Sequence, residues 1–109
     1  MMLELTKADN GKTVEARPGY LITIRLPENP TTGFRWTVDK VDQLCVEAQG
    51  SSFSPAREAA VGGGGERTFS FQVKCEDGTG NIGLKLRREW EGDASVVERY
   101  GVTVKVRNT

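Results

Sequence analysis

The chain of 109 residues carries 15 basic and 15 acidic side chains, and this zero net charge argues against nucleic acid or a charged membrane surface as its partner. Histidine is absent, so the chain has no Ser-His-Asp or Cys-His pair, and we expect neither catalysis nor a metal site. The length fits a single domain, residues 1–109, which can bury a sufficient core without a metal or cross-links.

Hydrophobic and polar residues alternate along most of the chain, which is typical of strands with one face in a core and the other in water. In chain order, the predicted strands are residues 2–6 with 12–16 as one split strand, then 20–27, 33–39, 44–53, 66–75, 81–87 and 96–107. No segment shows a convincing helical period. About seven strands separated by turns predict an all-β, immunoglobulin-like β-sandwich.

In immunoglobulin-like strand order, three of the connections emerge at the same end of the sandwich. We name them the first loop (residues 28–33, ENPTTG), the second loop (54–66, SPAREAAVGGGGE) and the third loop (87–95, RREWEGDAS). Each is longer or more unusual in composition than a connection between two strands requires. The sequence therefore directs attention to this end as a surface for a partner.

The first loop places two threonines between a proline and a glycine. Pro27 and Pro30 restrict the backbone before them, and Gly33 can supply a positive φ where the next strand begins. Thr31 and Thr32 are unusual at a turn, where Asn, Asp, Ser or Gly is preferred. An ordinary rigid turn is one interpretation. The other is a preordered binding loop, because a loop that is already stiff loses less entropy on contact.

The second loop contains four consecutive glycines, which are costly to order and contribute no side-chain packing. A flexible linker is one explanation, although two residues suffice to join neighbouring strands. Close approach of bare backbone to a partner is another. A phosphate-binding loop is a weak third, because no lysine and no helix follow the glycines.

Two tryptophans have different expected environments. Trp36 lies in a predicted strand and suits the core position that a tryptophan takes in immunoglobulin-like domains. Trp90 lies in the charged third loop, beyond the alternating pattern. It is either an exposed interface anchor or a lid folded over the end of the sandwich.

Taken together, the three loops resemble the chagasin-like inhibitors of papain-type cysteine peptidases. That family carries NPTTG and an aromatic residue in the first loop, a GxGG element in the second, and Arg-Pro-Trp or Arg-Pro-Phe in the third. The third motif departs from the pattern here, because Glu89 replaces the proline. The residues that match are Asn29, Pro30, Thr31, Thr32, Gly33, Phe34, Gly62, Gly63, Gly64, Gly65, Arg88 and Trp90.

The resemblance implies a tight-binding, reversible inhibitor that blocks the active-site cleft of a papain-like (cathepsin-type) cysteine peptidase without being cleaved. It implies that Thr31 and Thr32 lie near the catalytic cysteine and histidine of the peptidase. The second loop would follow the non-primed side of the cleft, and Trp90 would pack on the primed side. No cofactor is implied, and we expect a monomer in the absence of the peptidase.

The alternative is an immunoglobulin-like adhesion or carbohydrate-binding module that uses the same loop end. A sugar site needs several exposed aromatic residues, and Trp90 is the one good candidate in the sequence. A purely structural domain would leave the glycine run and Trp90 unexplained.

The two cysteines, Cys45 and Cys75, are opposite one another when residues are counted from a turn near residue 60. Their predicted strands nevertheless place them on different faces, whereas cross-strand neighbours share a face. We therefore expect two free thiols, as in a reducing compartment. No apolar run reaches the length of a membrane span and no signal peptide begins the chain, which favours the cytoplasm unless a signal has been removed.

Overall fold

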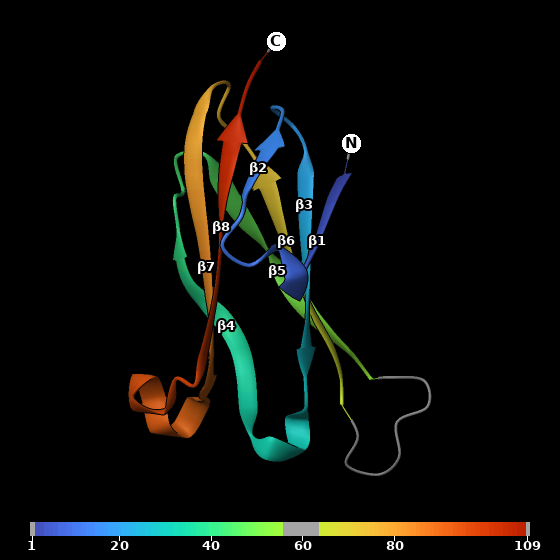
Figure 1. Cartoon of the computed structure of the whole chain (residues 1–109), viewed down its shortest axis with the longest axis vertical. Coiled ribbons are helices and arrows are strands. Elements are labelled where there is room, and N and C mark those ends of the chain that lie inside the picture. Colours follow the sequence, from blue (N-terminus) through green and yellow to red (C-terminus); the bar gives the residue numbers. More distant parts are fainter. Residues whose placement is uncertain (1, 56–63, 109) are drawn as a thin grey trace.

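Two four-stranded sheets face one another in the computed structural model of the protein, which describes residues 2–55 and 64–108 (Figure 1). The strands are β1 (Met2–Thr6), β2 (Thr13–Ala16), β3 (Leu21–Glu28), β4 (Phe34–Val41), β5 (Val46–Pro55), β6 (Gly65–Val73), β7 (Gly78–Arg88) and β8 (Glu98–Val106). Three short 3-10 turns are η1 (Lys7–Asp9), η2 (Pro30–Thr32) and η3 (Glu89–Ser95). None of the described segments is a helix long and apolar enough to cross a membrane.

The strand order is that of an immunoglobulin-like sandwich, as the alternation predicted. One sheet has the order β1-β3-β6-β5 and the other the order β2-β8-β7-β4. The first predicted strand is indeed split: β1 pairs in parallel with β3, and β2 pairs in parallel with β8 in the other sheet. The two halves therefore count as separate strands, and the described residues form eight strands rather than about seven.

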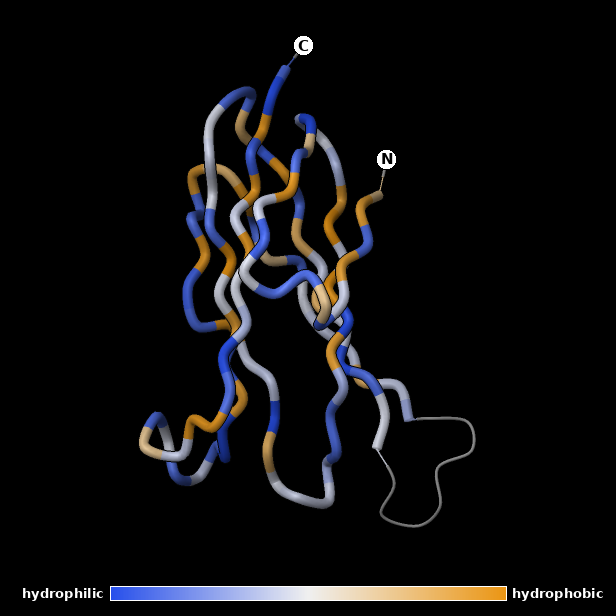
Figure 2. Tube along the Cα trace, in the orientation of Figure 1, coloured by the Kyte–Doolittle hydropathy of each residue, from blue (hydrophilic) through white to orange (hydrophobic). Residues whose placement is uncertain are grey.

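The core is built from the inward positions of the alternating strands. Figure 2 shows hydrophobic residues recurring along the strands, whereas the turn between β3 and β4 has intermediate hydropathy. Trp36 is 3% exposed, as predicted, and its indole Nε1 donates a hydrogen bond to the Pro27 carbonyl at 2.9 Å. Other core residues are Ile22, Ile24, Leu26, Phe69, Phe71, Val73, Ile82, Leu84, Tyr100, Val102, Val104 and Val106.

The first and third loops and the described ends of the second loop gather at one end of the sandwich, opposite the two chain ends (Figure 1). The first loop joins β3 to β4 and contains η2, and the third loop joins β7 to β8 and contains η3. Residues 56–63 of the second loop, including Gly62 and Gly63, lie outside the described residues. The described parts of this loop are the end of β5 and the residues Gly64 and Gly65 at the start of β6.

Cys45 and Cys75 form a disulfide, with their Cα atoms 4.5 Å apart, so the expectation of two free thiols is wrong. The expected conflict of faces does not arise, because both cysteines lie outside the strands. Cys45 comes just before β5 and Cys75 comes after the end of β6. Leu44, the first residue of the predicted strand 44–53, is 93% exposed, and Cys45 next to it is buried.

The backbone beyond the paired strands explains how the two cysteines meet. The regular register ends with Val46 opposite Val73. The next two amides, of Lys74 and Cys75, both donate hydrogen bonds to the Cys45 carbonyl, at 2.8 and 3.3 Å. The chain therefore turns around this carbonyl and brings the two sulfur atoms together.

Replacing both cysteines, Cys45→Ala with Cys75→Ala, should destabilise the protein. The disulfide spans a sequence separation of 30 residues, and closing a loop of that length stabilises a fold by about 3 to 4 kcal/mol through the unfolded chain. Urea unfolding of the oxidised protein and of the double variant measures the difference. Reductant should lower the stability of the parent protein alone, and equal stability of the two oxidised proteins would contradict the assignment.

Candidate functional site

A buried ion pair lies directly beneath the three loops. Glu28 ends β3 and Arg67 is near the start of β6, and their side chains are 2% and 9% exposed. The Arg67 Nη2 and Nε atoms lie 2.9 and 3.2 Å from Glu28 Oε2. The second carboxylate oxygen, Oε1, accepts the amide hydrogen of Trp36 in β4 at 2.7 Å. One carboxylate thus connects the two sheets at the loop end.

The first loop is held by hydrogen bonds within itself. Asn29 caps η2: its Oδ1 accepts from the Thr31 amide at 3.1 Å and from the Thr31 hydroxyl at 2.7 Å. The Thr32 hydroxyl donates to the Asn29 carbonyl at 2.8 Å and accepts from the Phe34 amide at 3.3 Å. Both threonines are exposed, yet their hydroxyl groups stabilise the turn.

Gly33 ends this turn with a backbone that favours glycine. Its φ is +80°, in the left-handed region, and its amide donates to the Pro30 carbonyl at 3.0 Å. A Cβ at this position would also overlap the six-membered ring of Trp90. Gly33 therefore permits both the turn and a close contact between the first and third loops.

Trp90 has features of both an exposed interface anchor and a lid that contacts the end of the sandwich. Its side chain is 73% exposed, so the indole is not buried in the sandwich. The tip of the ring nevertheless contacts the backbone at Gly33. This large apolar side chain thus has a defined support from the first loop and a wide free face.

Arg88 also links the first and third loops. Its guanidinium carbon lies 4.5 Å from the centre of the Phe34 ring, a cation–π arrangement. Its Nε donates to the Thr32 carbonyl at 3.4 Å and its Nη1 to Glu91 at 3.2 Å. The sequence motif identifies Arg88 as a site residue, but it does not predict that the guanidinium stacks on Phe34.

Ion pairs and one hydroxyl fix the third loop to β7. The Ser95 hydroxyl accepts the Arg88 amide at 2.9 Å and lies 2.7 Å from the Gly92 carbonyl. Lys85 Nζ lies 2.7 Å from Asp93 Oδ1. This hydrogen bond raises the pKa of Lys85 above its ordinary value, and the ammonium in turn lowers the pKa of Asp93. Both shifts widen the pH range over which the pair stays charged.

Glu89, which replaces the family proline, is the first residue of η3. Its carboxylate lies 3.9 Å from the Arg35 guanidinium in β4, and both side chains are largely exposed. The ion pair is therefore weak in water, but it links the third loop to β4 where a proline would have stiffened the loop directly.

The two described glycines of the second loop approach other backbone closely. A Cβ on Gly65 would overlap the Ser54 carbonyl and the Phe53 ring, so the pairing of β5 with β6 already requires glycine there. A Cβ on Gly64 would lie 3.3 Å from the Glu28 carbonyl and 3.7 Å from the Asn29 Cβ. Gly64 thus lies beside the start of the first loop.

The first loop stands between two hollows. One of about 540 Å³ is lined by the loop together with Gly64, Leu86 and Val97, and one of about 380 Å³ by the loop together with Phe53 and Trp90. Val97 is 63% exposed and was not singled out by the sequence. The loop therefore has open space on both flanks, beside its contacts with Trp90 and Arg88.

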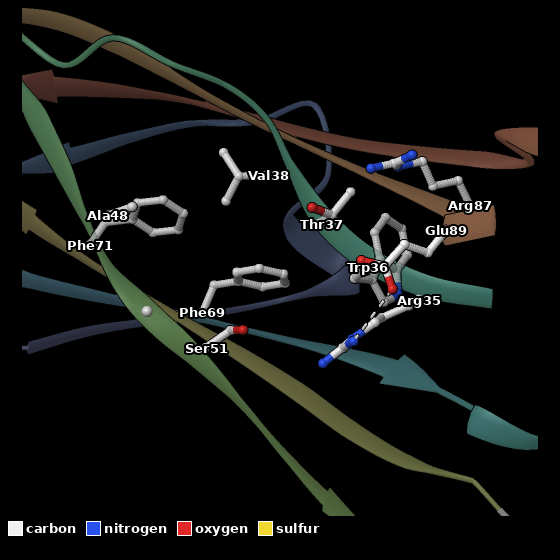
Figure 3. Close-up of a pocket in the computed structure, with 11 residues that line it drawn as sticks. Arg35, Trp36, Thr37, Val38, Ala48, Ser51, Phe69, Phe71, Arg87 and Glu89 are labelled. Carbon is white, nitrogen blue, oxygen red and sulfur yellow. Dashed lines mark ion pairs between the residues drawn. The ribbon is translucent and has the colours of Figure 1, made fainter. Parts of the chain in front are cut away.

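A further groove, of about 260 Å³, lies along the side of the sandwich between β4 and β5 (Figure 3). Phe69, Phe71 and Val38 line it, and it meets the loop end at Arg87 and at the Arg35–Glu89 ion pair. Glu89, which departs from the family pattern, is the residue of the three motifs that lines this groove. Within residues 2–55 and 64–108, no three His, Cys, Asp or Glu side chains gather as metal ligands.

Comparison with known proteins identifies relatives over nearly the whole chain. Residues 15–104 match the family described as Chagasin family peptidase inhibitor I42. Chagasin of Trypanosoma cruzi is 34% identical, covering 96% of this chain and 98% of that protein. Amoebiasin-1 of Entamoeba histolytica is 32% identical, covering 85% of this chain and 89% of that protein.

Solved structures have the same fold. The cysteine protease inhibitor EhICP2 of Entamoeba histolytica superimposes with a TM-score of 0.82 at 23% identity, covering 97% of this chain and 96% of its own. PbICP-C, solved in complex with falcipain-2, has a TM-score of 0.62 at 14% identity, covering 97% of this chain and 98% of its own.

Truncating one member of the buried pair should be strongly destabilising. Glu28→Ala or Arg67→Ala leaves the other charge buried without a partner, at a cost of about 3 to 5 kcal/mol each. The double variant should lose much less than the sum of the two. Urea unfolding measures all three against an exposed control, the Lys74–Glu47 pair at 3.7 Å, whose removal should cost less than about 1 kcal/mol. Additive losses for Glu28 and Arg67 would show that they are not coupled.

Glu89→Pro should be tolerated by the fold. Proline suits the first position of a helical turn, and Arg88 before it has φ −86° and ψ 122°, the extended conformation that a residue before proline prefers. We expect an unchanged or slightly higher melting temperature, since the exposed ion pair that is lost contributes little. A melting temperature lower by more than about 5 °C would mean that the Glu89 amide or carboxylate is needed.

Proposed function

The chain belongs to the chagasin family of peptidase inhibitors, and we propose that it inhibits papain-like cysteine peptidases reversibly by filling the active-site cleft with its three loops. The family consists of inhibitors and not of enzymes. One observation carries the proposal: the first and third motifs and the described glycines of the second, Gly64 and Gly65, gather at one end of the sandwich on a shared rigid base. Such a preordered surface loses little entropy on binding.

Each loop has a separate part in this proposal. Thr31 and Thr32 enter the cleft beside the catalytic cysteine and histidine of the peptidase. The glycines of the second loop, Gly62 to Gly65, follow the non-primed side, where bare backbone can approach the cleft wall. Trp90 packs on the primed side with the free face of its indole. Asn29, Pro30, Gly33, Phe34 and Arg88 complete the binding surface.

The geometry of the first loop supports inhibition without cleavage. A peptidase needs the scissile carbonyl in a near-attack position, which an extended peptide reaches easily. Here the amides of Thr31, Thr32 and Gly33 are all hydrogen-bonded inside a 3-10 turn. Presenting a peptide bond in the cleft would require breaking these bonds, so the loop occupies the site and is not a substrate.

A peptidase partner is also consistent with the related structures. PbICP-C forms a complex with falcipain-2, and we extend this kind of partner to the present chain. Three loops at one end would bury on the order of 800 Å² per partner, the size of a standard stable interface. The adhesion or carbohydrate-binding alternative has less support, because Trp90 is the only aromatic residue that is largely exposed in the described part of the chain.

Titration of papain with the purified protein tests the proposal, with a fluorogenic peptide as substrate. We expect stoichiometric loss of activity, recovery on dilution, and an intact inhibitor by mass spectrometry. Absence of inhibition of papain and of a small panel of cathepsin-like enzymes would overturn the proposal and favour the adhesion-module alternative.

Trp90→Ala should raise the inhibition constant at least about thirtyfold, as loss of an interface anchor worth about 2 kcal/mol would, while unfolding is unchanged. Gly64→Leu should weaken inhibition in the same way, because a side chain there would press on Glu28 and Asn29 and displace the first loop from the second. Leu44→Ala is the matched control, since Leu44 is also an exposed apolar residue but lies beside the distant disulfide. Unchanged inhibition by both loop variants would contradict the three-loop mechanism.

A further inference from the structure

We infer that Arg88 is a positioning residue that fixes the first loop in its inhibitory shape and couples it to the third loop. This inference rests on the proposed function, because the shape in question is the one that enters the peptidase cleft. It assigns to Arg88 a role inside the inhibitor, beyond its place on the proposed binding surface.

The hydrogen bonds described above within the first loop are all short-range. They run among Asn29, Pro30, Thr31, Thr32 and the following amides, over at most three positions in sequence. Bonds this local fix the shape of the turn but not its direction relative to the sheets. The hollows on both sides also leave the turn without packing against the sandwich.

Contacts from the third loop provide the missing support. The Arg88 guanidinium covers the Phe34 ring just after the turn and donates to the Thr32 carbonyl at its tip. Its other end is held by Glu91, and the Trp90 ring rests on Gly33. Thr32 and Phe34 therefore cannot reorient without breaking contacts to Arg88 at the end of β7.

The backbone of Arg88 is held in place by strand pairing and a hydrogen bond. Its side chain needs such a fixed position in order to support the first loop. Arg88 pairs with Phe34 across the β4–β7 ladder, and its amide donates to the Ser95 hydroxyl at 2.9 Å. Its side chain therefore starts from a fixed point and reaches over the first loop.

The chemistry of the contact requires arginine. A guanidinium is planar and can stack on a ring while donating hydrogen bonds in its own plane, whereas an ammonium is a compact point charge. Arg88→Lys keeps the charge near Glu91 but loses both the stacking and the fixed donor to Thr32. If Arg88 acted only through its charge, lysine would replace it without loss.

The test compares Arg88→Lys and Arg88→Ala with the parent protein and with Arg107→Ala, an exposed arginine beyond β8. Hydrogen exchange of the Thr32, Gly33 and Phe34 amides is measured by NMR in the free inhibitor, together with its urea unfolding. We expect about tenfold faster exchange of these amides in both Arg88 variants, with global unfolding nearly unchanged. Arg107→Ala should leave exchange as in the parent protein.

The same variants are then incubated with papain, and the inhibition constant and the integrity of the chain are followed. Both Arg88 variants should inhibit about tenfold more weakly, and mass spectrometry should detect slow cleavage within residues 30–33. A loosened turn can adopt the extended form that cleavage needs. In the double variant Arg88→Lys with Phe34→Leu, exchange should rise by less than the product of the two single effects, because both changes remove the same stacking contact and only the Arg88 change also removes the donor to Thr32.

The outcomes separate this inference from the proposed function. Weaker inhibition with unchanged amide exchange and no cleavage would overturn the inference and make Arg88 a direct contact residue. Full retention of slow exchange in Arg88→Ala would overturn it as well. If the parent protein does not inhibit papain at all, the proposed function fails, while the exchange measurement on the free protein still decides whether Arg88 positions the loop.

Discussion

The ion pair between Glu28 and Arg67 is the constraint on which the loop end depends. Both charges are removed from water, so neither can leave the other without a large desolvation penalty. The Glu28 carboxylate also accepts the Trp36 amide, which belongs to the opposite sheet. The ends of β3, β4 and β6 therefore stay in one arrangement, and the first and second loops start from these ends. Buried pairs add little net stability as a rule, so the value of this one lies in fixing geometry.

Above this base, the stiffness of the binding surface comes from many small interactions and not from packing. The threonine hydroxyls, the Asn29 cap and the left-handed Gly33 shape the first loop. This explains threonine at a turn tip, because its hydroxyl can close the turn while its branched carbon restricts χ1. In the third loop, the ion pair of Glu89 with Arg35 and the bonds of Ser95 take the place of a proline.

The sequence predicted the strands, their order and the common end of the three loops, because alternation and turn residues are local signals. It also placed Trp36 in the core and Trp90 outside it. The buried pair was missed although a signal was present: Glu28 continues the inward positions of Leu26, and Arg67 those of Phe69. The disulfide was missed because strand ends, and hence the faces of Cys45 and Cys75, shift by two residues from the predicted bounds. Contacts such as Arg88 on Phe34 join residues 54 positions apart, and no local pattern encodes them.

The internal bonding of the first loop also limits what it can offer a peptidase. The amides of Thr31, Thr32 and Gly33 and the hydroxyls of both threonines already have partners within the turn. Few donors are left for a partner, so the turn contributes mainly shape, methyl groups and exclusion of water. Under the proposed three-loop mechanism, affinity would then come largely from the free face of the Trp90 indole and from the backbone of the second loop. A surface of this kind can bind several peptidases whose clefts have the same shape but different side chains. Recognition then depends on shape complementarity and not on specific hydrogen bonds.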